Sequence, residues 1–138
     1  MRTVFADACY WIALFDPRDE LHQKANETSQ NLGKCRIVTS EMVLAEFLNG
    51  LSGKGPEIRE KAVKASRAIM ENPNVEVVPQ TSQQFRDALD RYASRQDKEW
   101  GLTDCASLQI MEQKSIREAL TGDHNFQQAG FTALMRQE

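Results

Sequence analysis

The sequence contains no apolar run near the roughly 20 residues that a membrane-spanning helix requires. After Met1 it passes directly into a short apolar segment at residues 4–6, without the long apolar stretch and cleavage site of a signal peptide. Internal repeats, low-complexity tracts and linker-like segments are also missing. We therefore expect a soluble cytoplasmic protein without membrane contacts, in which residues 1–138 form a single domain.

Cysteine is scarce, and its spacing argues against a zinc site or a disulfide framework. The chain has three cysteines, Cys9, Cys35 and Cys105, which are odd in number, widely separated and form no C-x-x-C pair. We expect them to be buried thiols in a reducing compartment.

An excess of positive charge is missing as well. The chain has 17 Lys and Arg against 20 Asp and Glu, which gives a formal net charge of -3. This balance argues against a protein that coats nucleic acid through a basic surface. It remains compatible with a nucleic-acid substrate, because an enzyme can hold phosphates through metal ions bound to its own carboxylates.

Short β-prone segments alternate with longer helical segments along nearly the whole chain. Strands are expected at residues 3–6, 36–39, 75–78 and 119–121, with a last edge strand within 131–134. Helices are expected at residues 8–15, 18–32 and 56–70, and after the capping residues Ser40, Thr81 (or Ser82) and Thr103, ending near residues 51, 95 and 114. This alternation predicts an α/β fold with a mainly parallel sheet wrapped by helices.

Acidic residues occupy positions where such a sheet binds ligands, beyond the carboxyl ends of its strands. Asp7 and Asp123 each follow a predicted strand, and Asp104 falls in the first turn of the helix that Thr103 is expected to cap. Taken singly, each of these acids is better explained as a turn residue or as favourable charge at a helix start. In the helix after Ser40, both Glu41 and Glu46 lie near the border of the apolar stripe, so periodicity does not choose between them.

Four sequence blocks together resemble a known family. They are FADA at 5–8, TSEMVLAEF at 39–47, GLTDCAS at 101–107, and LTGDHNF at 120–126 followed by AGF at 129–131. In order and spacing these blocks resemble the PIN-domain ribonucleases, and in particular the small single-domain branch that includes VapC-type toxins. The resemblance covers nearly the whole chain and implies a PIN-like α/β/α sandwich.

The resemblance also implies site residues. The family's catalytic, metal-binding acidic cluster falls on Asp7, Glu46, Asp104 and Asp123, which decides between Glu41 and Glu46. Thr121 matches a hydroxyl residue that supports the site. Family members often have a basic residue directly after the last Asp; this chain departs from that pattern with His124, which is a candidate substrate contact.

The function implied is hydrolysis of RNA phosphodiester bonds by a metal-activated water, leaving 5′-phosphate and 3′-hydroxyl ends. Carboxylate oxygens suit Mg²⁺ or Mn²⁺ rather than zinc. The same resemblance implies that the protein is the toxin of a toxin–antitoxin module, which forms a homodimer and binds a small antitoxin protein. The alternative is a non-catalytic PIN-fold module that binds RNA or protein. A D-x-D phosphatase is disfavoured, because Asp7-Ala8-Cys9 lacks the second aspartate.

Two further interpretations concern the N-terminal helices. The aromatic and aliphatic load of residues 8–15 indicates core packing, with a partner-binding surface as the alternative. His22 is expected on a helix surface.

Overall fold

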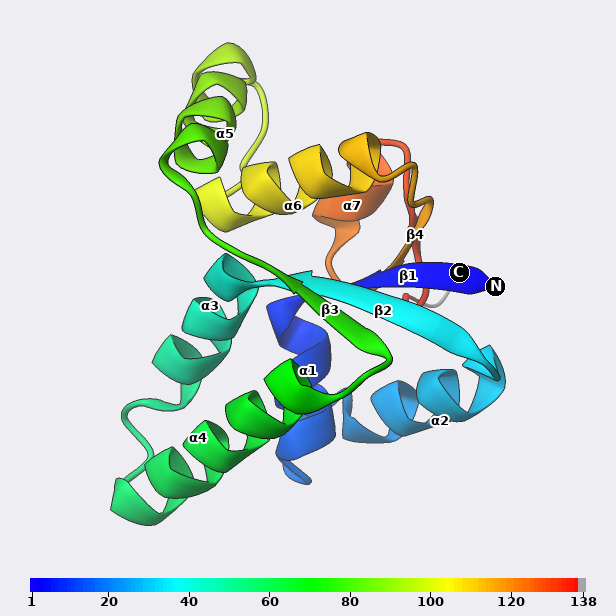
Figure 1. The fold of residues 1–138 in the computed structure, drawn as a ribbon, viewed down its shortest axis with the longest axis vertical. Coiled ribbons are helices and arrows are strands. Elements are labelled where there is room, and N and C mark those ends of the chain that lie inside the picture. Colours follow the sequence, from blue (N-terminus) through cyan, green and yellow to red (C-terminus); the bar gives the residue numbers. More distant parts are fainter. Residues whose placement is uncertain (137–138) are drawn as a thin grey trace.

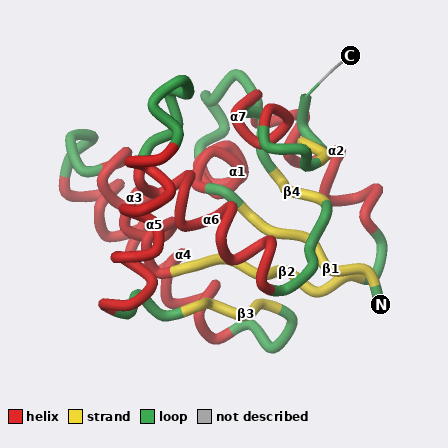
Figure 2. Tube along the Cα trace, turned by 90° about the horizontal axis from the view of Figure 1, so that it is seen from above, coloured by secondary structure: helices red, strands yellow, loops and turns green. Residues whose placement is uncertain are grey.

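The computed structural model describes residues 1–136, in which five parallel strands form one sheet in the order β3-β2-β1-β4-β5 (Figure 1). The strands are β1 (Arg2–Ala6), β2 (Cys35–Ser40), β3 (Val75–Val78), β4 (Glu118–Leu120) and β5 (Thr132–Ala133). Figure 2 shows β3, β2, β1 and β4 following one another across the sheet. The register places Val4 beside Ile37 and Ala6 beside Leu120, so β1 is the central strand. The predicted parallel α/β fold is therefore confirmed.

Helices cover both faces of this sheet. They are α1 (Ala8–Phe15), α2 (His22–Leu32), α3 (Glu41–Leu51), α4 (Pro56–Glu71), α5 (Ser82–Ser94), α6 (Leu102–Gln113) and α7 (His124–Gln128). In Figure 1, α1, α2 and α4 lie on one side of the sheet and α6 and α7 on the other, with α5 packed against α6. Within residues 1–136, no helix is both long and apolar enough to cross a bilayer.

The core lies around β1 because that strand has neighbours on both edges and helices on both faces. Val4, Phe5 and Ala6 have no exposed surface. Such a continuous apolar run is typical of a central parallel strand. Phe47 of α3 and Leu108 of α6 are buried in the same core.

The aromatic helix α1 belongs to this core. Tyr10 and Trp11 are buried, and the Tyr10 hydroxyl and the Trp11 indole N–H each have a hydrogen-bond partner. The Trp11 Nε1–H donates to Thr39 Oγ1 at 3.2 Å, and the Tyr10 hydroxyl lies 2.8 Å from Ser29 Oγ. These contacts favour core packing over the partner-surface alternative.

The second helix begins later than the sequence predicts. It starts at His22 rather than residue 18, because the Asp16 and Asp19 side chains each accept a backbone N–H two residues later and stabilise turns there. His22 is half-buried, with Nδ1 2.6 Å from the Ala13 carbonyl oxygen, so it lies only partly on the helix surface.

The cysteine prediction is correct for one residue of three. Cys105 is buried, whereas Cys9 and Cys35 are only half-buried.

Two of the predicted helix caps are confirmed and one is wrong. Ser40 Oγ accepts the Val43 N–H at 3.1 Å, and Thr81 Oγ1 accepts the Gln84 N–H at 3.0 Å. The expected Thr103 cap is replaced by Gly101, two residues earlier in the chain, because the Asp104 side chain accepts the Gly101 N–H. Helix α7 was not predicted from the sequence, since five residues give too little periodicity.

Candidate active site

The candidate acids lie where the strand order reverses. Chain connections run from β1 outward to β2 and β3, then return across β1 to β4 and β5. Such a switch point leaves a crevice at the carboxyl ends of the two central strands. Asp7 directly follows β1 and Asp123 lies shortly after β4, so both acids lie at this crevice. Helices α3 and α6, which pack against each other, bring in Glu46 and Asp104.

Asp7 is the most deeply buried of these acids, with 5% of its surface exposed. Its backbone N–H donates to the Leu120 carbonyl oxygen at 3.2 Å, which continues the pairing of β1 with β4. Its carboxylate Oδ2 accepts the Thr121 hydroxyl at 2.9 Å. Burial, and next the negative charge of Asp104, raise the pKa of Asp7 to about 7.

Thr121 joins the ends of the two central strands. Its Oγ1 donates to Asp7 Oδ2 and accepts the Asp123 N–H at 3.0 Å. Cys9 Sγ lies 3.3 Å from Thr121 Oγ1 and accepts the Gly122 N–H at 3.3 Å. The hydroxyl of Thr121, directly after β4, therefore orients the carboxylate of Asp7, directly after β1.

Asp104 is the third residue of α6. Its Oδ2 accepts the Gly101 N–H at 3.1 Å, which closes the N-terminus of the helix. The same oxygen accepts the Asn125 side-chain amide at 3.1 Å. Burial raises the pKa of Asp104, as does the negative charge of Asp123, although the Gly101 hydrogen bond opposes the rise. The Asp104 carboxylate thus caps the start of α6 and is also influenced by the charge of Asp123 at the acidic site.

The structure separates Glu41 from Glu46. Glu41 Oε1 accepts the Gln80 N–H at 2.7 Å, so its carboxylate holds the segment that follows β3. Glu46 as a residue is exposed, but burial at its carboxyl end raises its pKa. The Thr103 hydroxyl opposes this rise, and the charges of Asp104 and Asp123 add to it. Glu46 is the glutamate that lies with the other acids.

The segment after β4 carries Asp123, His124 and Asn125. Asp123 Oδ1 accepts the Asn125 backbone N–H at 2.9 Å and caps α7. His124 has 59% of its side chain exposed, and its Nδ1 lies 3.7 Å from Asp123 Oδ1. An exposed imidazole beside the acids is available to a ligand at this crevice.

The donor chemistry of the site fits a hard divalent cation. The groups that shift the pKa values of Asp7, Glu46 and Asp104 are other acids, hydroxyls, one side-chain amide and backbone N–H groups, with no Lys or Arg of residues 1–136 among them. Carboxylates without a cationic partner suit Mg²⁺ or Mn²⁺. In the same part of the chain, no three His, Cys, Asp or Glu side chains are already spaced to coordinate one ion.

Sequence reasoning missed two side chains at this site. Asn125 bonds to Asp104 and Asp123, and Cys9 contacts Asp7 Oδ2 at 3.7 Å. Each lies two residues after an acid, a spacing typical of aspartate turns that would have drawn attention to both.

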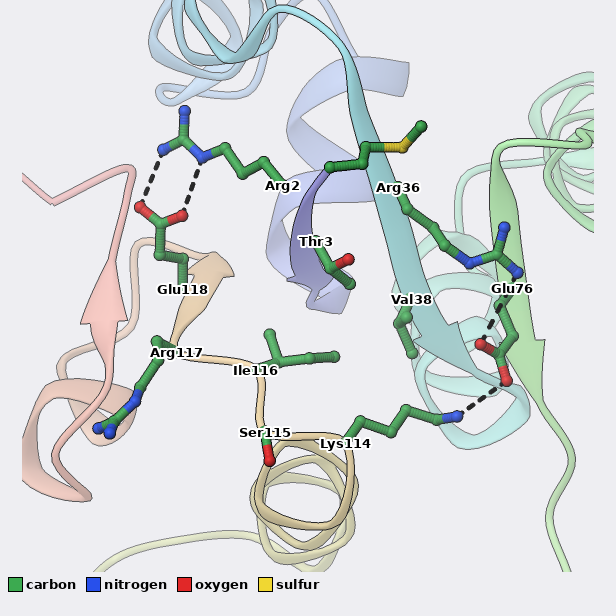
Figure 3. Close-up of a pocket in the computed structure, with 11 residues that line it drawn as sticks. Arg2, Thr3, Arg36, Val38, Glu76, Lys114, Ser115, Ile116, Arg117 and Glu118 are labelled. Atoms are coloured by element: carbon green, nitrogen blue, oxygen red, sulfur yellow. Dashed lines mark hydrogen bonds and ion pairs between the residues drawn. The ribbon is translucent and has the colours of Figure 1, made fainter.

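A separate cavity of about 590 Å³ lies at the opposite, amino-terminal end of the sheet (Figure 3). Arg2 forms two hydrogen bonds with Glu118, at 2.8 Å each, and Lys114 Nζ lies 3.0 Å from Glu76. Within each pair the positive and negative charges neutralise each other at the amino-terminal ends of the strands. None of the four candidate acids lines this cavity.

Comparison with solved structures finds the same fold in a bacterial toxin and in two protein–DNA complexes. The structure of VapC20 from Mycobacterium tuberculosis, a sarcin–ricin loop cleaving toxin, matches with a TM-score of 0.84 and 26% identity, over 94% of this chain and 96% of that one. VapBC2 from Rickettsia felis, bound to a DNA fragment from their promoter, gives a TM-score of 0.64 and 13% identity over 95% and 96% of the chains. FitAB bound to the IR36 DNA fragment gives 0.65 and 16% over 98% and 97%. The last two show likeness of fold alone.

Sequence comparison gives the family. Curated proteins yield no significant match to the chain. The family model of the PIN domain, however, matches residues 4–132, a range that includes all four candidate acids. The protein belongs to the PIN domain family.

Proposed function

We propose that this protein is a divalent-cation-dependent ribonuclease and the toxin of a toxin–antitoxin module. One observation carries the proposal. At the switch point of a PIN fold, the negative charges of neighbouring acids raise the pKa values of Asp7, Glu46 and Asp104, and no Lys or Arg within residues 1–136 shifts them. This concentration of negative charge is costly without a cation, so a purely structural role is a poor explanation.

The side chains have separate roles in this proposal. Asp7, Glu46 and Asp104 hold the principal Mg²⁺ or Mn²⁺ and the attacking water, and Asp123 holds the same or a second ion. When bound, the cation supplies a water of lowered pKa and stabilises the negative charge on the phosphate.

The supporting side chains act on geometry and on the substrate. Thr121 orients the Asp7 carboxylate through its 2.9 Å hydrogen bond. His124, exposed at the rim of the crevice, contacts the RNA.

The first RNA to test follows from the most informative structural match. VapC20 is described as a sarcin–ricin loop cleaving toxin, and it is 26% identical to this chain over 94% of its length. A hairpin containing the sarcin–ricin loop is therefore the first substrate we propose. A different structured RNA is the comparison substrate.

Partner proteins are also proposed. VapBC2 and FitAB are two-component assemblies on DNA, which supports an antitoxin partner for this chain. On α5, Phe85, Leu89 and Tyr92 expose 43%, 47% and 53% of their surface and recur every three or four residues. This apolar stripe supports self-association into a homodimer.

The test is cleavage of the hairpin by purified protein with Mg²⁺ or Mn²⁺, and with EDTA. We expect EDTA to stop cleavage and Asp104→Asn to slow it more than about 100-fold, because losing a ligand should exceed the 10–100-fold typical of an outer-shell partner. Asp90→Asn, at an exposed acid of α5, is the matched control and should cut normally. Cleavage that survives EDTA, or an Asp104→Asn protein as active as wild type, would contradict the proposal.

A further inference from the structure

Asn125 bridges two of the candidate acids with a single side chain. Its Nδ2 lies 3.1 Å from Asp104 Oδ2 and 3.4 Å from Asp123 Oδ2, and the residue is only 9% exposed. Resting on the proposed function, we propose that Asn125 is a positioning residue that holds the Asp104 and Asp123 carboxylates in place for a divalent cation.

The chemistry of the neighbours fixes which end of the amide faces the acids. Both contacts of the Asn125 side chain are carboxylate oxygens, which accept hydrogen bonds when ionised. Only the NH₂ end donates, so the opposite orientation of the amide would set three acceptors against one another. The bridge is therefore specific to a donor at this position.

The bridge connects elements that are distant in sequence. Asp104 belongs to α6, whereas Asp123 and Asn125 follow β4, 21 residues separating Asn125 from Asp104. Two neighbouring carboxylates repel each other, and an N–H placed on both offsets part of that repulsion. Asn125 thereby fixes how the start of α6 sits against the end of β4.

His124 does not replace Asn125 in this role. Its Nδ1 contacts Asp123 at 3.7 Å, the side chain is 59% exposed, and no contact with Asp104 is found within residues 1–136. The amide, buried and shared by both acids, is the group that sets their relative position.

The bridge is also separable from the cap of α7. The cap uses the Asn125 backbone N–H, which donates to Asp123 Oδ1 at 2.9 Å. Every substitution of the side chain except proline keeps this N–H. A change in cation binding on substitution therefore reports on the bridge and not on the cap.

The experiment compares Asn125→Leu with wild type in thermal melts titrated with Mn²⁺ alone. We expect the Mn²⁺ concentration for half-maximal stabilisation to rise at least about tenfold, the typical effect of losing an outer-shell partner. Asn125→Gln keeps the donor and should recover part of the affinity. Cleavage by Asn125→Leu should also recover as Mn²⁺ is raised, which a merely structural defect would not show.

Gln127→Leu is the matched control, the same kind of substitution at an exposed position of α7. It should titrate with Mn²⁺ as wild type does. If Asn125→Leu does not fold, Asn125→Ala removes the same donor without adding bulk.

The outcomes separate the two proposals. A donorless variant that melts lower than wild type yet responds to the same Mn²⁺ concentrations overturns the role of Asn125 and leaves the proposed function standing. A wild-type protein that gains no stability from Mn²⁺ and cuts no RNA overturns both.

Discussion

Asp7 lies on a central strand end, buried and beside other acids, where an ionised carboxylate is at its least stable. Its pKa of about 7 follows first from burial and then from the charge of Asp104, and the Thr121 hydrogen bond offsets only part of the rise. Burial and the negative charges of neighbouring acids also raise the pKa values of Glu46 and Asp104. Without a cation, Asp7 is therefore expected to be partly protonated near neutral pH.

The protonation of Asp7 predicts how stability varies with pH. Its pKa is about 7 in the folded chain and near 3.8 in the unfolded chain, so the folded state binds more protons between these values. The free energy of unfolding without cation should therefore fall as pH rises from about 4 to about 7, then level off. For Asp7 alone the fall is at most roughly 4 kcal/mol.

Urea unfolding in EDTA at several pH values checks this prediction. Asp7→Asn cannot ionise, so it should gain stability over wild type progressively from pH 4.5 to pH 8. The exposed Asp90→Asn should follow the wild-type curve. Parallel curves for Asp7→Asn and wild type would contradict the assigned protonation.

A second residue-scale prediction distinguishes the two glutamates of α3. Glu46→Gln should abolish cation-dependent cleavage, because Glu46 lies with the acids. Glu41→Gln should cut normally and lose no more than about 1 kcal/mol, since its side-chain oxygen can still accept the Gln80 N–H. Cleavage rates and urea unfolding of both variants decide the matter. If only Glu41→Gln lost activity, Glu41 would be the cation ligand and Glu46 would not.

At the scale of elements, helix starts matter according to what the helix carries. Helix α3 begins at the buried cap Ser40 and carries Glu46, whereas α5 begins at the exposed cap Thr81 and carries none of the candidate acids. Loss of either cap costs about 1 kcal/mol, and up to about 2 in the least favourable cases.

We therefore expect Ser40→Ala and Thr81→Ala to lower stability alike but to differ in activity. Ser40→Ala should slow cleavage, because fraying of α3 displaces Glu46 from the other acids. Thr81→Ala should leave the cleavage rate unchanged. Urea unfolding and single-turnover cleavage of the two proteins test this, and equal rates for both would show that the start of α3 does not position Glu46.

At the scale of the whole molecule, the exposed stripe on α5 lies outside the core that surrounds β1. Phe85, Leu89 and Tyr92 recur at helical spacing, and each keeps about half of its surface exposed within residues 1–136. Exposed apolar patches of this kind mark protein–protein contacts.

Light scattering should give a mass of about twice 15.7 kDa for the wild type. Leu89→Lys places a charge in the stripe and should shift the protein toward the monomer without lowering its melting temperature. Gln83→Lys adds the same charge outside the stripe on the same helix and should leave the mass unchanged. A wild-type protein that is monomeric at micromolar concentration would contradict the proposed dimer formed through this stripe.

Local sequence patterns were enough to predict the fold class and most element positions. The fold class can be recognised from the apolar run at residues 4–6, which is buried in the structure. The hydroxyls of Ser40 and Thr81 cap their helices through hydrogen bonds to residues three positions later, so these signals are also visible in the linear sequence. The start at His22 and the Gly101 cap were mispredicted, because side chains of Asp19 and Asp104 decide them and several local solutions compete there.

The tertiary structure alone decided which side chains share the site. Periodicity left Glu41 and Glu46 equivalent, and the family resemblance favoured Glu46; the packing of α3 on α6 is what turns Glu46 toward Asp104. The Asn125 bridge joins residues 21 apart, and the raised pKa of Asp7 depends on charges and burial contributed by other elements. Such properties arise from long-range proximity, which a linear pattern does not encode.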